Sequence, residues 1–484
     1  MISSTKERIN HSQLEKAASR KPWYLLLGEI VLWQIVAVLV VEASLAIAGL
    51  GEEEIFKLDP QLGFRHMSNK KVTWRSEGFA GSYFNADGLR EAGITVAKPA
   101  STYRIALLGD SLTESLQVTV DKSFGQQVQA AMQRDLARNV QVINFGTSGY
   151  STVQEFLQLK QQVMKYKPDL VLLCYNSRDC FENWSPPDEV LTNVRPAALR
   201  LPGHDLIVDS SPVTQWMKTP RARFMKQVEF LRQHSRLWGL YSAAELDLSM
   251  HNETYKRLIF FLTKPGKAIR QSISELKNEL SKWNAAGSKD SQAHSDKKGQ
   301  SAKPDKTKAE SVAAKSPSSP TAAVLSENPL PSAKKESDSG SRSGTKKNTA
   351  ALSEKTEEEK GRRNYESIIS GTLSALLAEM KKTCSAGGAR LAVVALPVRS
   401  DLSAREGMDT SFNGYAYKDE LRILQAASEQ NSLPLINIHE SAKTLSANEK
   451  DNLFYLVHLT PKGHDFVSSR LAPALEKLLT EEAQ

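Results

Sequence analysis

Short apolar runs alternate with longer amphipathic stretches in two parts of the chain, residues 103–180 and 364–482. The apolar runs have the length of buried strands, and the stretches between them have the spacing of helices with one apolar face. Strands are expected at 103–110, 140–146, 168–176, 389–398 and 433–438. Helices are expected at 123–137, 152–166, 364–388, 417–430 and 465–482. Strands that alternate with helices indicate crossover connections, so both parts predict layers of one α/β domain with a parallel sheet.

The pattern is weaker around the first part. Residues 51–100 mix Gly, Asn and Asp with aromatic residues, which favours short strands and turns. Between 185 and 284 two proline-containing loops stand out, at 186–187 and 202–205. Residues 257–283 have the spacing of one or two amphipathic helices.

Residues 285–360 have a different composition, dominated by Ser, Lys, Ala, Glu, Pro and Gly. Such a segment cannot bury enough apolar surface to offset its loss of conformational entropy, so we expect it to be disordered. Because strands and helices of the same kind flank it, it is expected to be an insertion into one domain. Its lysines would contact anionic polymers or lipids, or the tract would serve only as a solvated spacer.

Residues 23–50 form the longest apolar run of the chain, broken by Glu29, Gln34 and Glu42. The run exceeds the roughly 20 residues that a membrane-spanning helix needs. Five basic residues precede it and the acidic sequence GEEE follows it at 51–54. This charge asymmetry predicts a cytoplasmic N-terminus and an extracytoplasmic remainder. The alternative is a buried amphipathic helix.

The expected organisation therefore has five parts. They are a cytoplasmic tail at 1–22, a transmembrane anchor at 23–50, the first part of the α/β domain at 51–284, the disordered insertion at 285–360 and the second part of the domain at 361–484.

Composition limits the classes of function. The net charge of +8 gathers in the low-complexity tract and beside the apolar run, and no motif of nucleic-acid binders is present. We therefore expect no nucleic-acid partner. The three cysteines, Cys174, Cys180 and Cys384, make no disulfide framework, and Cys174 is expected to be a buried strand residue. No Cys or His pair has convincing zinc-ligand spacing and no phosphate-binding glycine loop occurs, so neither a metal nor a cofactor is expected.

The sequence Gly109-Asp110-Ser111 ends the first expected strand. In open parallel sheets the reactive groups lie beyond the carboxyl ends of the strands, and this is such a position. A serine there has two interpretations. It caps the next helix, as most such serines do, or it is a nucleophile, which needs a base and donors for an oxyanion.

Three stretches together resemble the signature blocks of the SGNH, or GDSL, hydrolases. They are LGDSLTES at 108–115, NFGTSGYST at 144–152 and VHLTPKGH at 457–464. The resemblance covers roughly residues 60–180 and 365–480. It implies a three-layer, flavodoxin-like α/β fold, and the lead-in FNADGLR is similar to that of membrane-anchored members.

The resemblance implies a role for one residue of each block. Ser111 corresponds to the nucleophile and His458 to its general base. The backbone amides of Ser111 and Gly149 correspond to oxyanion donors. His464 is the nearby competitor of His458, but Thr460 and Pro461 read as the N-cap and first residue of a helix, which places His464 inside that helix.

The chain departs from the family pattern at two places. Three residues before the catalytic His the family has an Asp that orients the imidazole, and this chain has Tyr455. The phenol of Tyr455 can accept a hydrogen bond from the imidazole and orient it, but it supplies no carboxylate. Asp451 or Glu449 would substitute as the acid, or the Ser–His pair acts without one. In the third block the family's oxyanion Asn aligns with Arg178, while Asn176 stands two residues earlier. Either side chain is a candidate donor, since an arginine also carries N–H groups. For Arg178 the alternative is a salt bridge with Asp179 or Glu182.

The expectation is a membrane-anchored serine esterase that acts on O-acyl, for instance O-acetyl, esters of an envelope glycan or lipid. The substrate class follows from the family and the expected location. An acyltransferase that uses the same pair, and a glycan-binding or scaffold protein with a degraded site, are the alternatives.

Overall fold

The computed structural model of the chain describes residues 22–51, 54–75, 77–91, 93–135, 139–184, 194–251, 346–402, 411–412 and 415–480. By its internal contacts the chain divides into two compact units. One comprises residues 1–54 and 225–258, and the other comprises 55–224 and 259–484. Residues 225–258 thus group with the apolar N-terminal helix, whereas the sequence suggested that they belong to the α/β domain.

The larger unit is built on a five-stranded parallel sheet with the order β13-β10-β7-β5-β6. Its strands are β5 (Thr102–Gly109), β6 (Asn139–Asn144), β7 (Leu170–Tyr175), β10 (Arg390–Ala395) and β13 (Leu435–Asn437). Numbered along the chain this order is 2-1-3-4-5, the flavodoxin-like arrangement. All five expected strands are present, and the last two come from the second part of the chain, so 103–180 and 364–482 form one sheet.

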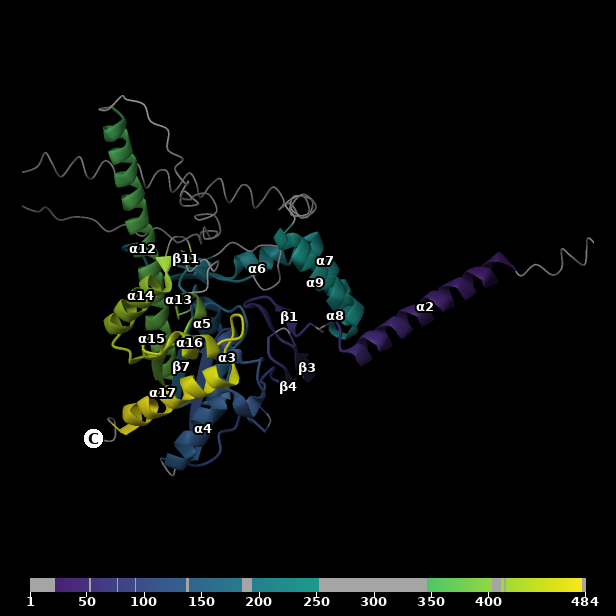
Figure 1. Ribbon diagram of the computed structural model, residues 1–484, viewed down its shortest axis with the longest axis horizontal. Helices are drawn as coiled ribbons and strands as arrows, with labels where there is room; N and C mark the ends of the chain where they lie inside the picture. The colour runs from purple at the N-terminus through teal and green to yellow at the C-terminus, as the bar shows by residue number, and fades with distance from the viewer. Residues whose placement is uncertain are drawn as a thin grey trace, which may run out of the picture. The chain divides into compact units, whose positions relative to one another are not determined.

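Helices cover both faces of the sheet, which gives the three layers (Figure 1). One face carries α4 (Phe124–Asp135) and α17 (Pro461–Thr480), which lie side by side. The other carries α5 (Thr152–Gln161), α12 (Lys346–Ala386) and α14 (Tyr417–Gln430). Successive strand residues point to opposite faces, so Leu107 packs under α4 while Leu108 packs under α5.

Shorter elements join these layers. The short helices are α3 (Ser111–Glu114), α6 (Ser211–Trp216), α7 (Pro220–Gln227), α13 (Arg399–Leu402), α15 (Ile438–Lys443) and α16 (Ala447–Asn452). The 3-10 turns are η1 (Val120–Lys122), η2 (Val163–Tyr166) and η3 (Glu182–Trp184). Four antiparallel hairpins pair β1 (Phe56–Asp59) with β2 (Gly63–His66), β3 (Lys70–Trp74) with β4 (Ala80–Phe84), β8 (Ala197–Leu199) with β9 (Ile207–Asp209), and β11 (Ser411–Phe412) with β12 (Tyr415–Ala416). The first two hairpins are the short strands expected within 51–100.

The structure describes only part of the middle of the chain, where a disordered tract and one or two helices were expected. Helix α12 begins at Lys346, inside the tract 285–360, so the second part of the domain starts earlier than expected. Its added turns are rich in Ala, Glu and Lys, which favour helix without supplying apolar surface. The helices expected at 257–283 and most of the tract 285–360 lie outside the described residues.

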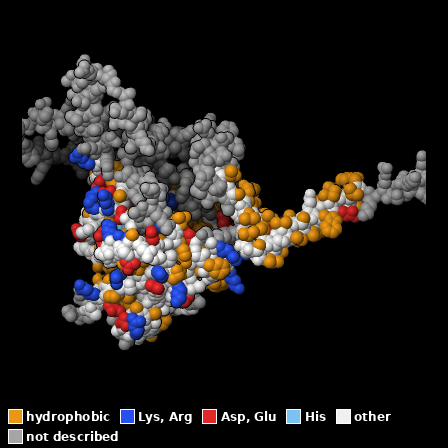
Figure 2. All heavy atoms as spheres, viewed as in Figure 1, with side chains coloured by type: hydrophobic (Ala, Val, Ile, Leu, Met, Phe, Trp, Pro, Cys, Tyr) orange, Lys and Arg blue, Asp and Glu red, His pale blue; other side chains and the backbone are white. Residues whose placement is uncertain are grey.

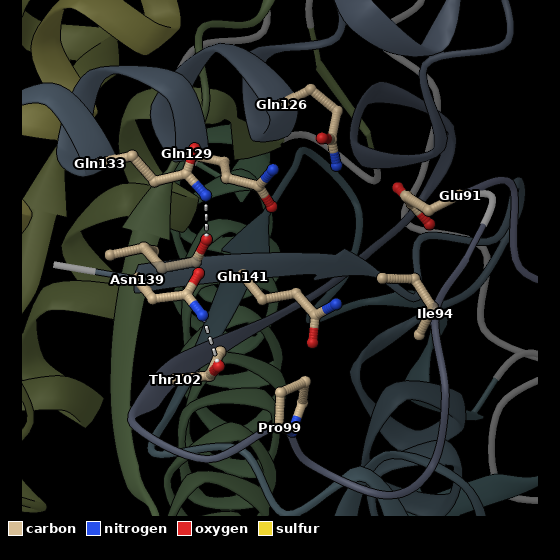
Figure 3. Close-up of a pocket in the computed structure, with 10 residues that line it drawn as sticks. Glu91, Ile94, Pro99, Thr102, Gln126, Gln129, Gln133, Asn139 and Gln141 are labelled. Carbon is tan, nitrogen blue, oxygen red and sulfur yellow. Dashed lines mark hydrogen bonds between the residues drawn. The ribbon is translucent and has the colours of Figure 1, made fainter.

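The edge strand β6 is covered by glutamine side chains of α4 (Figure 3). Gln133 donates to the carbonyl of Val140 (2.7 Å), and Gln129 accepts from the amide of Val142 (2.8 Å). Gln126 donates to the carbonyl of Val142 (3.3 Å). These bonds satisfy backbone groups that an open sheet edge would otherwise offer to another chain.

The smaller unit contains α2 (Trp23–Ala48), α8 (Glu229–His234) and α9 (Arg236–His251). Helix α2 is long and apolar enough to cross a membrane, and apolar side chains cover the face of it seen in Figure 2. The carboxylate of Glu42 accepts hydrogen bonds from the amides of Arg236 (2.8 Å) and Leu237 (3.3 Å) at the start of α9. This acid within the apolar helix is therefore partnered, as an ionisable residue in such a segment is expected to be.

Candidate active site

Ser111 lies at the carboxyl end of β5, as the first residue of α3. Asp110, not Ser111, caps this helix, because its Oδ1 accepts a hydrogen bond from the amide of Leu112 (3.0 Å). Gly109 allows the turn, since a Cβ there would lie 2.2 Å from Oγ1 of Thr113. The helix-cap interpretation of Ser111 therefore does not apply, and its hydroxyl is left for another role.

The loop after β6 lies against the Ser111 turn and carries Gly149. The amide of Thr147 donates to the carbonyl of Gly109 (2.9 Å), and Asn144 donates to the carbonyl of Thr113. Gly149 has φ +77°, a conformation that glycine adopts at little cost. Among the described residues, the amides of Ser111 and Gly149 have no protein acceptor, so both remain available to an oxyanion.

Glu114 fixes the loop of Gly149 from the Ser111 side. Its buried carboxylate accepts hydrogen bonds from the amide (3.0 Å) and the hydroxyl of Ser148. The other oxygen lies 2.5 Å from Nε2 of His66, which belongs to β2. The carbonyl of Glu114 accepts from the buried Arg90. The hairpin segment thus supports the loop that carries the expected oxyanion amide.

The third block follows β7 and contacts the first. Nδ2 of Asn176 donates a hydrogen bond to Oδ2 of Asp110, the residue before Ser111 (2.6 Å). This bond uses one of the two N–H groups of the Asn176 side chain. Arg178 is exposed and has φ +76°, which few residues other than glycine adopt. Its amide donates to Glu420 (2.7 Å). Of the two expected donors, Asn176 is the one whose side chain reaches the Ser111 turn through a hydrogen bond.

Buried carboxyl groups surround this junction. Burial raises the pKa of Glu155 well above its ordinary value, and the charge of Asp110 adds to the effect. Burial also raises the pKa of Asp179, with Glu155 and Asp110 as further causes. Burial likewise raises that of Asp110, although the bonds from Asn176 and Leu112 oppose it. The raised pKa values favour the neutral carboxyl forms, which limits the repulsion among these acids.

His458 lies in a tight hairpin between Leu453 and Leu459. The hairpin is closed by a bridge between Phe454 and Leu459 and by the amide of Tyr455, which donates to the carbonyl of His458 (2.8 Å). Arg399, buried in α13, donates to the carbonyls of Tyr455 and Leu456. The backbone on both sides of His458 is thus held in place.

His464 has a structural role. It is buried in α17, stacks on Phe124 and accepts a hydrogen bond at Nδ1 from the amide of Phe124 (3.3 Å). Burial lowers its pKa to about 3, with contributions from the charges of Arg90 and His458. The amide of Gly463 donates to Oγ1 of Thr460 (3.1 Å), so the helix begins where the sequence indicated.

Two observations link the turn of Ser111 to the hairpin of His458. Leu112 belongs to the same buried cluster as Leu459. The charge of His458 lowers the pKa of Asp110 against the effect of burial, so these two groups interact electrostatically. Residues far apart in sequence, in the turn of Ser111 and in the hairpin of His458, thus share one buried cluster.

The acid that contacts His458 is Glu77, which the sequence did not single out. Its Oε1 lies 3.1 Å from Nδ1 of His458, at a hydrogen-bonding distance but outside the angle of a linear bond. Its Oε2 accepts hydrogen bonds from three consecutive amides, those of Leu456 (3.2 Å), Val457 (3.0 Å) and His458 (2.9 Å).

The two acids that the sequence suggested for this place belong to α16. Glu449 is exposed and accepts from the amide (2.9 Å) and hydroxyl of Ser446 at the start of α16. Asp451 lies in the last turn of the same helix. The ring of Tyr455 packs on Gly78, where a Cβ would lie 3.0 Å from it. No sequence spacing could have revealed Glu77, because it is 381 residues from His458.

The cysteines, possible metal ligands and the pocket of Figure 3 were also compared with the position of Ser111. Cys174, Cys180 and Cys384 are buried free thiols, and burial raises the pKa of each, that of Cys384 to about 12. Within the described ranges, no group of three or more His, Cys, Asp or Glu residues has the geometry to hold a metal ion. The polar pocket of Figure 3 is lined by Thr102 and Asn139, the first residues of β5 and β6, so it lies at the opposite end of these strands from Ser111.

Comparison with known protein families gives one match. Residues 105–292 match the model of the GDSL-like lipase/acylhydrolase family. The match includes Ser111, Gly149 and Asn176 and ends before His458. No curated protein matches the chain.

Several solved structures show a distant likeness. A GDSL-like lipase from Bacteroides thetaiotaomicron is 10% identical, with 80% of this chain and 94% of that chain covered and a TM-score of 0.31. A putative acylhydrolase from Bacteroides fragilis is 10% identical, with 78% and 88% covered and a TM-score of 0.29. An acetylxylan esterase from Geobacillus stearothermophilus is 9% identical, with 77% and 94% covered and a TM-score of 0.30. TM-scores this low do not establish a shared fold by themselves.

The flavodoxin-like strand order of the sheet is consistent with the family match. Residues 105–292 are therefore similar to the GDSL-like lipase/acylhydrolase family, whose members are hydrolases that act on ester bonds.

Proposed function

We propose that the chain is a membrane-anchored serine esterase in which Ser111 and His458 cleave O-acyl esters of a cell-envelope glycan or lipid. The observation that carries the proposal is that Asp110 caps α3 in place of Ser111. The turn of Ser111 and the hairpin of His458 also contribute Leu112 and Leu459 to one buried cluster, and His458 acts electrostatically on Asp110. A serine hydroxyl that does not cap its helix is free to act as a nucleophile, and a histidine at the same end of the sheet is a candidate for the base that it needs.

The reaction follows from these groups. Oγ of Ser111 attacks the ester carbonyl while Nε2 of His458 accepts the hydroxyl proton, and the carbonyl oxygen becomes an oxyanion. The amides of Ser111 and Gly149 donate to that oxyanion, with Asn176, which is hydrogen-bonded to Asp110, as the side-chain donor. Collapse of the intermediate expels the alcohol, which takes the proton from His458 and leaves an acyl-Ser111. Water, activated by His458, then releases the carboxylic acid and restores the serine.

The location rests on α2. Helix α2 is long enough to span a bilayer, with Lys6, Arg8, Lys16, Arg20 and Lys21 before it and GEEE after it. The positive-inside rule then gives a cytoplasmic N-terminus and an extracytoplasmic catalytic domain. Acylated envelope glycans and lipids are the esters that such a domain meets.

Hydrolysis of p-nitrophenyl acetate by the full-length protein in detergent tests the proposal. Ser111→Ala and His458→Ala are each expected to lower kcat by at least about 1000-fold. Ser469→Ala and His204→Ala, at exposed positions outside the site, are matched controls and should leave turnover unchanged. Turnover that survives in Ser111→Ala would contradict the mechanism, and a folded wild-type protein without turnover would favour a binding or scaffold role.

The same acyl-Ser111 can pass its acyl group to an alcohol instead of water. Addition of a methyl glycoside to the assay distinguishes the two reactions, because transfer yields an acylated glycoside and hydrolysis yields free acetate. Free acetate as the main product is the outcome that the esterase proposal predicts.

A further inference from the structure

Glu77 lies in the turn that joins β3 to β4, in a segment that precedes all three family-like blocks. Its side chain is only 14% exposed, and that of His458 is 17% exposed. The turn fits closely against the site, because a Cβ on Gly78 would lie 2.5 Å from the carbonyl of Gln117 and 3.0 Å from the ring of Tyr455. Glu77 is therefore wedged between the segment after Ser111 and the hairpin of His458.

The two carboxylate oxygens of Glu77 have separate partners. Oε2 accepts from the three consecutive amides of residues 456–458, and Oε1 faces Nδ1 of His458 at 3.1 Å. Successive amides that converge on one oxygen form a site for an anion. One side chain thus holds the backbone of the hairpin and places a carboxylate oxygen beside the ring that the hairpin carries.

The surroundings keep Glu77 ionised. Burial raises its pKa, but the backbone bonds from His458 and Val457 and the charge of His458 outweigh burial, so that the net pKa is lowered. A charged carboxylate opposite Nδ1 favours the tautomer with the proton on that nitrogen. Nε2 is then left with a free electron pair, which a general base needs.

We propose that Glu77 is the positioning residue of the catalytic histidine and replaces, from the N-terminal hairpin, the acid that the family has three residues before it. This inference rests on the proposed function of Ser111 and His458. Glu77 acts through His458, by setting the tautomer and orientation of its ring and by stabilising the imidazolium that forms when Ser111 is deprotonated.

Glu77→Gln tests the charge separately from the backbone contacts, since a carboxamide oxygen still accepts from the three amides. We expect kcat for p-nitrophenyl acetate to fall by at least about 100-fold, with KM changed by less than about threefold. Glu77→Asp keeps the charge and should retain at least about ten times the kcat of Glu77→Gln. Glu449→Gln is the matched control, because Glu449 also accepts from backbone and lies on the helix just before the hairpin, but is exposed.

The outcomes separate this inference from the proposed function. If Ser111→Ala abolishes turnover and Glu77→Gln retains kcat within about threefold of wild type, the role of Glu77 is refuted and the esterase proposal stands. Equal losses in Glu77→Gln and Glu77→Asp, each with a lowered Tm, would reduce Glu77 to a structural contact.

Proton NMR decides the question even for a protein without turnover. The Nδ1–H proton of His458 should give a low-field resonance in the wild type and in Glu449→Gln. We expect Glu77→Gln to lose it, and its persistence in that variant would overturn the inference.

Discussion

Asp110 caps helix α3 by accepting a hydrogen bond from the amide of Leu112, and Ser111 between them takes no part in the cap. The same carboxyl group accepts a hydrogen bond from Asn176 through its other oxygen. One acid thus ties the Ser111 turn to the loop after β7, and the serine is free for chemistry.

This relationship predicts that Asp110→Ala impairs both stability and turnover. Loss of an N-cap costs about 0.5 to 2 kcal/mol of unfolding free energy, and the turn around Ser111 also loses its contact with Asn176. Asp110→Asn keeps one acceptor oxygen for the amide of Leu112 and should stay closer to wild type in stability. Thermal unfolding together with kcat measures the pair of effects, and an Asp110→Ala protein with unchanged kcat would contradict this role.

Glu114 is predicted to support the oxyanion site without touching substrate. Glu114→Gln weakens the bonds to His66 and Ser148 that hold the loop of Gly149. We expect kcat to fall by about tenfold or more with little change in KM, because a misplaced donor affects the transition state most. Glu440→Gln, which removes an exposed ion pair with Lys443, is the control and should leave both constants unchanged. Equal kcat values for the two variants would show that the loop does not depend on Glu114.

The buried Glu420 gives stability a defined pH dependence. Burial raises the pKa of its carboxyl to about 8, although the bonds from Arg178, Tyr175 and Cys180 lower it, against an ordinary value of 4.5. Between these values the folded protein keeps a proton that the unfolded chain has lost, so this group makes the free energy of unfolding fall as pH rises. The shift corresponds to at most about 5 kcal/mol.

Urea denaturation of wild type and Glu420→Gln at several pH values measures this contribution. The stability of wild type relative to the variant should decline from pH about 4.5 to about 8 and be flat outside that window. A constant difference across the window would mean that Glu420 does not hold its proton in the folded state.

The glutamines of α4 are predicted to protect the edge of the sheet. Gln129→Leu leaves the amide of Val142 without its partner, which costs roughly 1 to 3 kcal/mol if water does not replace it. The exposed edge should also favour self-association. Sedimentation velocity and thermal unfolding check both effects, with Gln425→Leu on the surface of α14 as the control. Wild-type behaviour of Gln129→Leu in both measurements would refute the protective role.

Much of the fold could be predicted from the chain because the central strands are buried on both faces and read as apolar runs. The run 103–110 became β5, and the run 389–398 became β10 across a long insertion. Helix α9 was not anticipated, since its polar residues interrupt any single apolar face. The start of α12 at Lys346 was also missed. The low apolar content of the tract 285–360 was used to predict disorder, and the helix propensity of its residues was not considered.

The expected site residues came from two sources, the order of the strands and the family-like blocks, and the latter supplied His458. Ser111 and Gly149 follow consecutive strands, so their proximity comes from the order of the sheet. Glu77 comes from a hairpin outside the sheet, and its contact with His458 depends on how that hairpin packs, which no local spacing encodes. Asn176 and Arg178 were left as alternatives because the direction of a side chain in a tight loop depends on its backbone angles.

The central claim is that Ser111 is a nucleophile activated by His458. Its most direct test is a fluorophosphonate probe applied to the full-length protein, with the labelled residue identified by peptide mass spectrometry. The account predicts one label on Ser111, none in Ser111→Ala, and strongly slowed labelling in His458→Ala. Labelling at another residue, or an unchanged rate in His458→Ala, would contradict it.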